Sequence, residues 1–403
     1  MFKIAFKNLL RNTKRSTLTI MIIIVATAGM VFGLSWFNGE EKIFVESGKK
    51  NTGDFRIANK DYEIRSKTFD VSANFYYFDI KEKIKESNYT GKSVARIRFG
   101  GMVYSNDRYE NALGTGIELE DKDIIGFDDY IYEGRFLKND DEIIIGETIR
   151  KKLNLKLGDE VTILTQTQEK SLYSLNYRVV AFYKMDNSRL NRSFFITLFS
   201  SQYLLDMEDA VTEVLFFSED EKNLASTYDF LLNDKEITDE LDIKKWNEVG
   251  MNESMSKVIP FVRLIFVFIF SILSGLSISN TMLMTVFERR HEIGLLKSLG
   301  VKERNIEKLF LLEGIYMGIF GSFVGISIGS GISLYLGKVG VNFGDSLEKI
   351  TSELNIKGII YPVLDLPTVI LTFTIAILTS IIATYMAISQ EVKKEAVVNM
   401  RNL

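Results

Sequence analysis

Residues 264–300 read LIFVFIFSILSGLSISNTMLMTVFERRHEIGLLKSLG, and they decide how the rest of the chain is interpreted. The segment 264–287 has no charged residue, whereas 288–300 holds five charged side chains and the chain's only histidine. A helix of about 20 apolar residues is long enough to cross the hydrocarbon core of a bilayer. Because lipid offers no partner for backbone polar groups, a span must be helical. The sequence therefore predicts a membrane helix followed directly by a short charged segment.

Working outward, three more apolar runs are long enough to span a membrane. Residues 18–37 and 366–390 carry no charge, and 309–337 carries only Glu313, near its start. A cleaved signal peptide is the alternative for the first run, but its apolar part is too long and SWFNGEE is a poor cleavage site. A buried helix of a soluble protein is the alternative for the others, and charge-free runs of this length are rare there. We expect four membrane helices.

Basic residues next to these runs predict the orientation, because cytoplasmic flanks are enriched in Lys and Arg. They gather before the first run, between the second and third, and after the fourth. These residues are Lys3, Lys7, Arg11, Lys14, Arg15, Arg289, Arg290, Lys297, Lys302, Arg304, Lys308, Lys393, Lys394 and Arg401. The chain is therefore predicted to be a multi-pass protein of the inner (cytoplasmic) membrane. Both termini are expected in the cytoplasm, and the large block 38–260 outside it.

Composition excludes several classes of function. Residues 41–257 contain 31 basic and 41 acidic side chains, so this block repels nucleic-acid phosphates. The absence of cysteine excludes disulfides, cysteine-ligated metals and cysteine nucleophiles. His291 has no second histidine or cysteine for a metal site, and no serine–histidine–acid set can be assembled around this one cytoplasmic histidine. TGKS at 90–93 lacks the first glycine of a phosphate-binding loop. We expect no catalytic residues, no metal, no directly bound cofactor and no nucleic-acid partner.

The outer block has the pattern of a mixed α/β domain, with a β-rich part at about 100–205. Short runs of β-branched and aromatic residues predict strands. They are 54–58, 95–105, 142–146, 159–164, 177–183, 193–198 and 212–217, and helices are predicted at 79–88 and 218–234.

The segment 288–300 has the pattern of a short amphipathic helix. Glu288 and Glu292 lie in its first turn and Lys297 in its last, as the helix dipole favours. Gly300 suits the left-handed position after a helix. Three apolar residues share one side at helical spacing, namely Ile293, Leu296 and Leu299. The helix either offers this stripe to a partner or is a basic membrane anchor with no partner.

Small residues recur at intervals of four in the third apolar run, which predicts close helix packing against the first or second span or a partner subunit. They are Gly314, Gly318, Gly321, Gly325 and Gly329. Glu313 begins the same run, and we expect its carboxylate either to reach the membrane interface or to make a structural contact near 288–300.

Residues 280–329, which contain both of these features, resemble the permease region of MacB-type ABC transporters. This superfamily includes macrolide exporters, the lipoprotein-releasing LolC and LolE subunits and the cell-division protein FtsX. The N-terminal FKIAFKNLLRNTKRSTLTI is similar to the amphipathic helix before the family's first span. TGDFRI, GTGIELED and IIIGETIRKKLNLKLGDEVTIL follow the family's order in the outer block, and LDIKKWNE is similar to the lipoprotein-releasing branch.

This resemblance implies that 288–300 is a coupling helix, which seats in a groove of a cytoplasmic ATPase dimer. Binding of ATP and Mg²⁺ is then expected only on that partner, and the chain itself is not an enzyme. The residues expected to contact the ATPase are Glu288, Arg289, Arg290, Glu292, Ile293, Leu296, Leu299 and Gly300. The other expected partners are a second permease copy or paralogue, membrane lipid and an extracytoplasmic cargo.

The resemblance also implies a mechanism in which ATPase closure moves the spans and the outer domain. Lipoprotein release from the inner membrane is the leading function. Export of a peptide, toxin or macrolide is one alternative, and FtsX-like activation of a cell-wall hydrolase is another.

The predicted fold class is an α-helical membrane protein with four spans and a large mixed α/β extracytoplasmic domain of the MacB-like periplasmic core type. The segments are an amphipathic helix 1–17, spans 18–37, 261–287, 306–337 and 366–390, the outer domain 38–260, the coupling-helix loop 288–305, an outer loop 338–365 and a cytoplasmic tail 391–403.

Overall fold

The computed structural model describes residues 13–65, 70–185, 190–342 and 359–392, and these divide into two units. Of these residues, the membrane unit combines 13–42, 258–342 and 359–392, and the outer unit combines those between 43 and 257. Most of the predicted helix 1–17, outer loop 338–365 and tail 391–403 lies outside the described residues.

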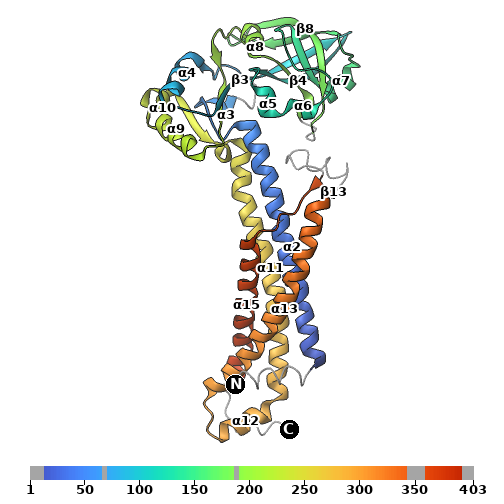
Figure 1. Ribbon diagram of the computed structural model, residues 1–403, viewed down its shortest axis with the longest axis vertical. Coiled ribbons are helices and arrows are strands. Elements are labelled where there is room, and N and C mark those ends of the chain that lie inside the picture. The colour runs from blue at the N-terminus through green and yellow to red at the C-terminus, as the bar shows by residue number, and fades with distance from the viewer. Residues whose placement is uncertain (1–12, 66–69, 186–189, 343–358, 393–403) are drawn as a thin grey trace. The chain divides into compact units, whose positions relative to one another are not determined.

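Four long helices run alongside one another in the membrane unit (Figure 1). They are α2 (Thr13–Thr52), α11 (Gly250–Glu288), α13 (Glu303–Val339) and α15 (Leu366–Val392). Each is long and apolar enough to cross a membrane. At about 1.5 Å per residue, α2 and α11 are nearly twice as long as the hydrocarbon core is thick, so both extend beyond it. Accordingly, α2 continues without a break past residue 37, where the first span was predicted to end.

The glycines of α13 lie where other helices approach most closely. At Gly321 and Gly325 the neighbour is α2, and a Cβ on Gly325 would lie 1.9 Å from Oγ1 of Thr27. At Gly314 and Gly318 the neighbour is α15, where the corresponding distance from Gly314 to Oγ1 of Thr384 is 2.0 Å. Gly329 lies against Ala28 and Val31 of α2. The structure therefore packs α13 between the first and fourth spans, and the fourth was not among the neighbours expected.

The outer unit contains an open antiparallel sheet in the order β12-β1-β11-β3. Its strands are β12 (Leu241–Lys245), β1 (Phe55–Asn59), β11 (Glu213–Phe217) and β3 (Lys92–Ser105). Side chains alternate between the two faces. Phe55, Ile57 and Ile97 join the apolar core, whereas Arg56 and Arg96 occupy the alternate positions.

The outer unit also contains a closed ring of six strands, paired in the order β3-β4-β9-β6-β8-β7 and back to β3. Pairing around a ring leaves no free sheet edge. The new strands are β4 (Arg108–Ile117), β9 (Ser193–Thr197), β6 (Glu142–Gly146), β8 (Leu172–Tyr183) and β7 (Glu160–Gln166), with β5 (Ile131–Gly134) added outside β8. Because β3 belongs to both sheets, the β-rich part expected to begin near residue 100 starts within a strand.

Short helices cover these sheets and connect their strands. They are α3 (Tyr62–Arg65), α4 (Tyr77–Glu86), α5 (Asp121–Ile125), α6 (Phe127–Tyr130), α7 (Glu147–Leu153), α8 (Leu198–Leu205), α9 (Glu221–Asn233) and α10 (Lys235–Glu240). Two 3₁₀ turns lie at Leu190–Arg192 and Trp246–Glu248, and two small strand pairs join Phe75–Tyr76 to Ala210–Val211 and Val341–Asn342 to Ile359–Ile360. The seven predicted strands and two predicted helices are confirmed, and so is the mixed α/β character.

Candidate coupling site

A short helix connects the second and third long helices. After α11 ends at Glu288, α12 (Arg290–Ser298) begins, and α13 follows at Glu303. Gly300 has φ of 82°, which is the left-handed conformation expected for it. The amide of Val301 donates to the carbonyl of Leu296 at 3.0 Å, so the helix end is satisfied by backbone. The sequence 288–300 thus forms a separate element between two predicted spans.

One face of α12 is buried against the helices of its own unit. Ile293 is 3% exposed and belongs to an apolar cluster with Met282 and Val286 of α11 and Phe310 of α13. Leu296 is half-buried against the same cluster. Ile293 and Leu296, which were both expected at the ATPase contact, therefore pack against their own bundle, Ile293 almost fully and Leu296 in part. Their stripe is the one that attaches α12 to its own bundle.

The opposite face of α12 is open. Leu295 is 54% exposed and Leu299 is 73% exposed, and the two lie one helical turn apart. His291 and Glu292 are exposed as well. Periodicity did not single out Leu295, because α12 has apolar residues on two faces and sequence spacing cannot tell which face the bundle covers. The apolar residues available to a partner on α12 are Leu295 and Leu299.

Arg289 and Glu313 form a buried ion pair at the start of α12. Nη1 of Arg289 lies 3.0 Å from Oε1 of Glu313, and their side chains are 7% and 3% exposed. The carbonyl of Arg289 also accepts the amide of Ile293 at 2.9 Å, so Arg289 forms the corner between α11 and α12. Arg289, which was also expected at the ATPase contact, is thus almost fully buried within its own unit. Glu313 makes the structural contact near 288–300 that was one of its two expected roles.

A second ion pair lies near the other end of α12. Nζ of Lys297 donates to Oε1 of Glu303, the first residue of α13, at 2.7 Å. The guanidinium of Arg290 lies over the ring of Phe287 at 4.1 Å, a cation–π contact. The helix is therefore tied to α11 and α13 by an apolar face and by ion pairs toward both ends.

The described part of the chain contains no cluster of three metal-ligating side chains. Lys92 and Ser93 of the TGKS segment are the first residues of strand β3, whereas a phosphate-binding loop opens a helix. Oγ1 of Thr90 donates to Asn223 at 3.0 Å.

Comparison with known proteins agrees with this arrangement. Residues 16–229, more than half of the chain, match the MacB-like periplasmic core domain family. Residues 264–392 match the FtsX-like permease C-terminal family. The second match includes α12 and most of the surrounding helices.

Relatives that align along most of the chain are ABC transporter membrane proteins. The uncharacterized ABC transporter permease MJ1507 of Methanocaldococcus jannaschii is 26% identical over 81% of this chain and 81% of its own length. The lipoprotein-releasing system transmembrane protein LolE of Haemophilus influenzae is 22% identical over 86% and 83%. The macrolide export ATP-binding/permease protein MacB of Bdellovibrio bacteriovorus is 43% identical over 17% of this chain, which spans only 10% of that protein.

Four apolar helices, a mixed α/β outer unit and these two family matches confirm the predicted fold class and resemblance. ABC transporter permeases are the non-catalytic membrane components of their systems, and the chain fits that role as a multi-pass membrane protein with an extracytoplasmic-type domain. The chain belongs to the MacB/FtsX-type family of ABC transporter permeases.

Proposed function

We propose that the chain is the membrane subunit of an ABC system that transmits force from a separate cytoplasmic ATPase to an extracytoplasmic cargo. Two permease chains and two ATPases form the working unit, and ATP and Mg²⁺ bind to the ATPases. The chain lies in the cytoplasmic membrane with both termini in the cytoplasm. Clusters of Lys and Arg beside the apolar runs support this orientation.

The observation that carries the proposal is the two-faced attachment of α12. Its inner face is held by Ile293 and the Arg289–Glu313 pair, and its outer face exposes Leu295 and Leu299. An ATPase that buries two leucines gains roughly 1.5–3 kcal/mol for each fully buried side chain. Because the inner face is tied to α11 and α13, displacement of α12 moves these helices with it.

Charged residues around the exposed leucines give the contact its orientation. Glu292 is exposed in the first turn, and Glu288 is exposed directly before the helix. Opposite charges on the ATPase would align the helix in its groove, since charge pairs at a rim affect register and association rate more than affinity. We therefore place Glu288, Glu292, Leu295, Leu299 and Gly300 at the ATPase contact.

For the cargo, we propose lipoproteins released from the outer leaflet of the cytoplasmic membrane. The supporting comparison is LolE of H. influenzae, which aligns along most of both chains. Macrolide export is the second candidate, because the outer unit matches the MacB-like periplasmic core domain and a short segment is 43% identical to a MacB.

Reconstitution separates these two cargoes. The chain and its partner ATPase are placed in proteoliposomes that contain either a triacylated lipoprotein or a labelled macrolide. ATP-dependent appearance of lipoprotein in the soluble fraction is expected, and an ATPase variant that binds but does not hydrolyse ATP is the control. Macrolide movement without lipoprotein release would favour the second candidate, and release equal to the control would reject lipoprotein as the cargo.

A further inference from the structure

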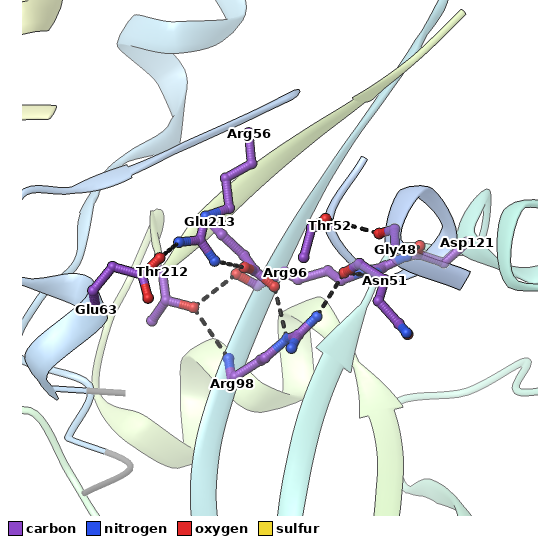
Figure 2. A network of polar contacts seen from close by, with 10 residues as sticks. All are labelled: Gly48, Asn51, Thr52, Arg56, Glu63, Arg96, Arg98, Asp121, Thr212 and Glu213. Carbon is purple, nitrogen blue, oxygen red and sulfur yellow. Dashed lines mark hydrogen bonds and ion pairs between the residues drawn. The ribbon is translucent and has the colours of Figure 1, made fainter. Parts of the chain in front are cut away.

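The outer end of α2 meets a network of mostly buried charges in the outer unit, in which the side chain of Arg98 is 30% exposed (Figure 2). Gly53 follows α2 with φ of 73°, and a Cβ there would lie 2.7 Å from the carbonyl oxygen of Phe55. Only glycine allows the chain to turn so directly from the helix into β1. The covalent connection between α2 and β1 consists of Gly53 and Asp54 alone. One glycine in the left-handed conformation does little to prevent the helix from rotating relative to the strand.

Two arginines bind the last turn of this helix directly. Nη2 of Arg98 donates to the carbonyl of Asn51 at 2.8 Å, and Nη1 of Arg96 does so at 3.4 Å. The last carbonyls of a helix have no partner within the helix and carry the negative end of its dipole. Arg96 and Arg98 lie two residues apart on β3, so they project from the same face of the strand. The end of α2 is thereby attached to the strand that the open sheet and the six-stranded ring share.

Buried acids hold both arginines in place. Nε of Arg96 donates to the two carboxylate oxygens of Asp121 at 3.0 and 3.1 Å, and Nε of Arg98 lies 2.8 Å from Oε1 of Glu213. The side chains of Asp121 and Glu213 are 0% exposed. The network continues through Arg56, which lies 3.3 Å from Glu213 and also bonds Glu63.

Such a network does little for net stability, because desolvation of buried charges offsets most of their attraction. What it supplies is a fixed orientation of the groups it joins, since each guanidinium forms its hydrogen bonds in a fixed plane.

An aromatic contact supports the same helix from the side. Trp246 packs edge-on against Phe44 at 5.4 Å, and a Cβ on Gly48 would lie 2.7 Å from its ring.

We propose that Arg98, assisted by Arg96, is a positioning residue that locks the outer end of α2 to β3. Movement of the first span then reaches the outer sheet as a rigid displacement and is not lost by rotation at Gly53. This inference rests on the proposed function, because it supposes that the spans move during the ATP cycle. The lock itself is a property of the outer unit and is testable without cargo.

The test uses the full-length chain with its partner ATPase in lipid nanodiscs. Arg98→Gln removes the guanidinium, and Arg98→Lys keeps the charge beside Glu213 but cannot bond Glu213 and Asn51 together. Arg135→Gln is the matched control, because Arg135 also pairs with a buried acid, Glu142, at 2.8 and 2.6 Å, but between the end of β5 and the start of β6. Hydrogen exchange by mass spectrometry is followed at residues 45–53 and 92–105, with and without ATP and vanadate.

We expect exchange at 45–53 to rise about tenfold or more in both Arg98 variants, as for loss of a charge-assisted hydrogen bond, and to stay unchanged in the Arg135 control. We also expect the vanadate-induced change at 92–105 to disappear in the Arg98 variants while ATP turnover stays within about twofold of wild type. Wild-type exchange at 45–53 in both Arg98 variants would overturn the lock, and a vanadate response of wild-type size would overturn its role in transmission. If the wild-type complex itself showed no vanadate response, both the proposed function and the role of Arg98 in transmission would be rejected. Exchange at 45–53 would still test whether Arg98 fixes the end of α2 to β3.

Discussion

At the scale of single residues, the Arg289–Glu313 pair is a contact that should be sensitive to substitution. Both side chains are almost fully buried, so replacing Glu313 with Ala leaves an uncompensated charge at the corner of α12. Breaking a buried pair in this way costs about 3–5 kcal/mol. We expect Glu313→Ala and Arg289→Ala each to lower the thermal unfolding midpoint in detergent and to weaken ATPase association. The exchanged pair Arg289→Glu with Glu313→Arg should recover part of both losses, and a double-mutant cycle with no coupling would contradict the structure.

A second prediction at the scale of single residues concerns Glu142 and the pH dependence of folding stability. Hydrogen bonds from Arg135, together with backbone amides of Lys138 and Asn139, lower the pKa of Glu142 to about 2. In an unfolded chain the pKa of a glutamate is about 4.3, so the ionised form contributes stability above that pH and loses it as pH falls through the folded value. The difference of about two units is worth about 3 kcal/mol.

We therefore expect the urea midpoint of the full-length protein, followed by tryptophan fluorescence, to fall between about pH 5 and pH 2. In Glu142→Gln this fall should be smaller, because the titrating carboxylate is absent, and the midpoint at pH 7 should already be reduced. Identical pH profiles for the two proteins would show that Glu142 does not carry this dependence.

At the scale of elements, the glycines of α13 make a specific packing prediction. A Cβ on Gly325 would lie 1.9 Å from Oγ1 of Thr27 and 2.5 Å from the carbonyl of Ile24, so α2 would have to move away. Gly331 lies on the same helix with nothing within 4 Å of its Cβ position. Gly325→Ala should cost about 1–3 kcal/mol through overpacking, whereas Gly331→Ala should be neutral. Thermal unfolding in detergent compares them, and equal midpoints would mean that α2 and α13 do not pack here.

At the scale of the whole molecule, composition was enough to predict the spans and seven of the ten strands in the large sheet of the outer unit. Long charge-free runs and alternating segments such as 95–105 are determined locally. Strand β4 was missed because RYENALGTGI has few large apolar residues, and it is held by pairing with β3 and β9. The Arg98–Glu213 contact joins residues far apart in sequence, so spacing alone could not reveal it. A contact of Glu313 near 288–300 was one of two expectations, but spacing could not identify Arg289 as its partner. The same reason explains why the inner and outer faces of α12 could not be told apart.

The assembled complex offers the last prediction, which concerns those two faces. The single variant Leu299→Asp and the double variant with Leu295→Asp place charge on the side of α12 that is exposed in the structure. Because a buried unpaired charge in the ATPase groove is costly, we expect co-purification of the ATPase to drop by at least about tenfold while the thermal midpoint of the permease stays unchanged. Leu296→Asp should instead lower that midpoint, since Leu296 packs on its own bundle. Leu172→Asp is the matched control, because Leu172 is 73% exposed on strand β8 of the outer unit and should affect neither property. Retention of the ATPase at wild-type level by the Leu295–Leu299 double variant would mean that the motor does not dock on α12.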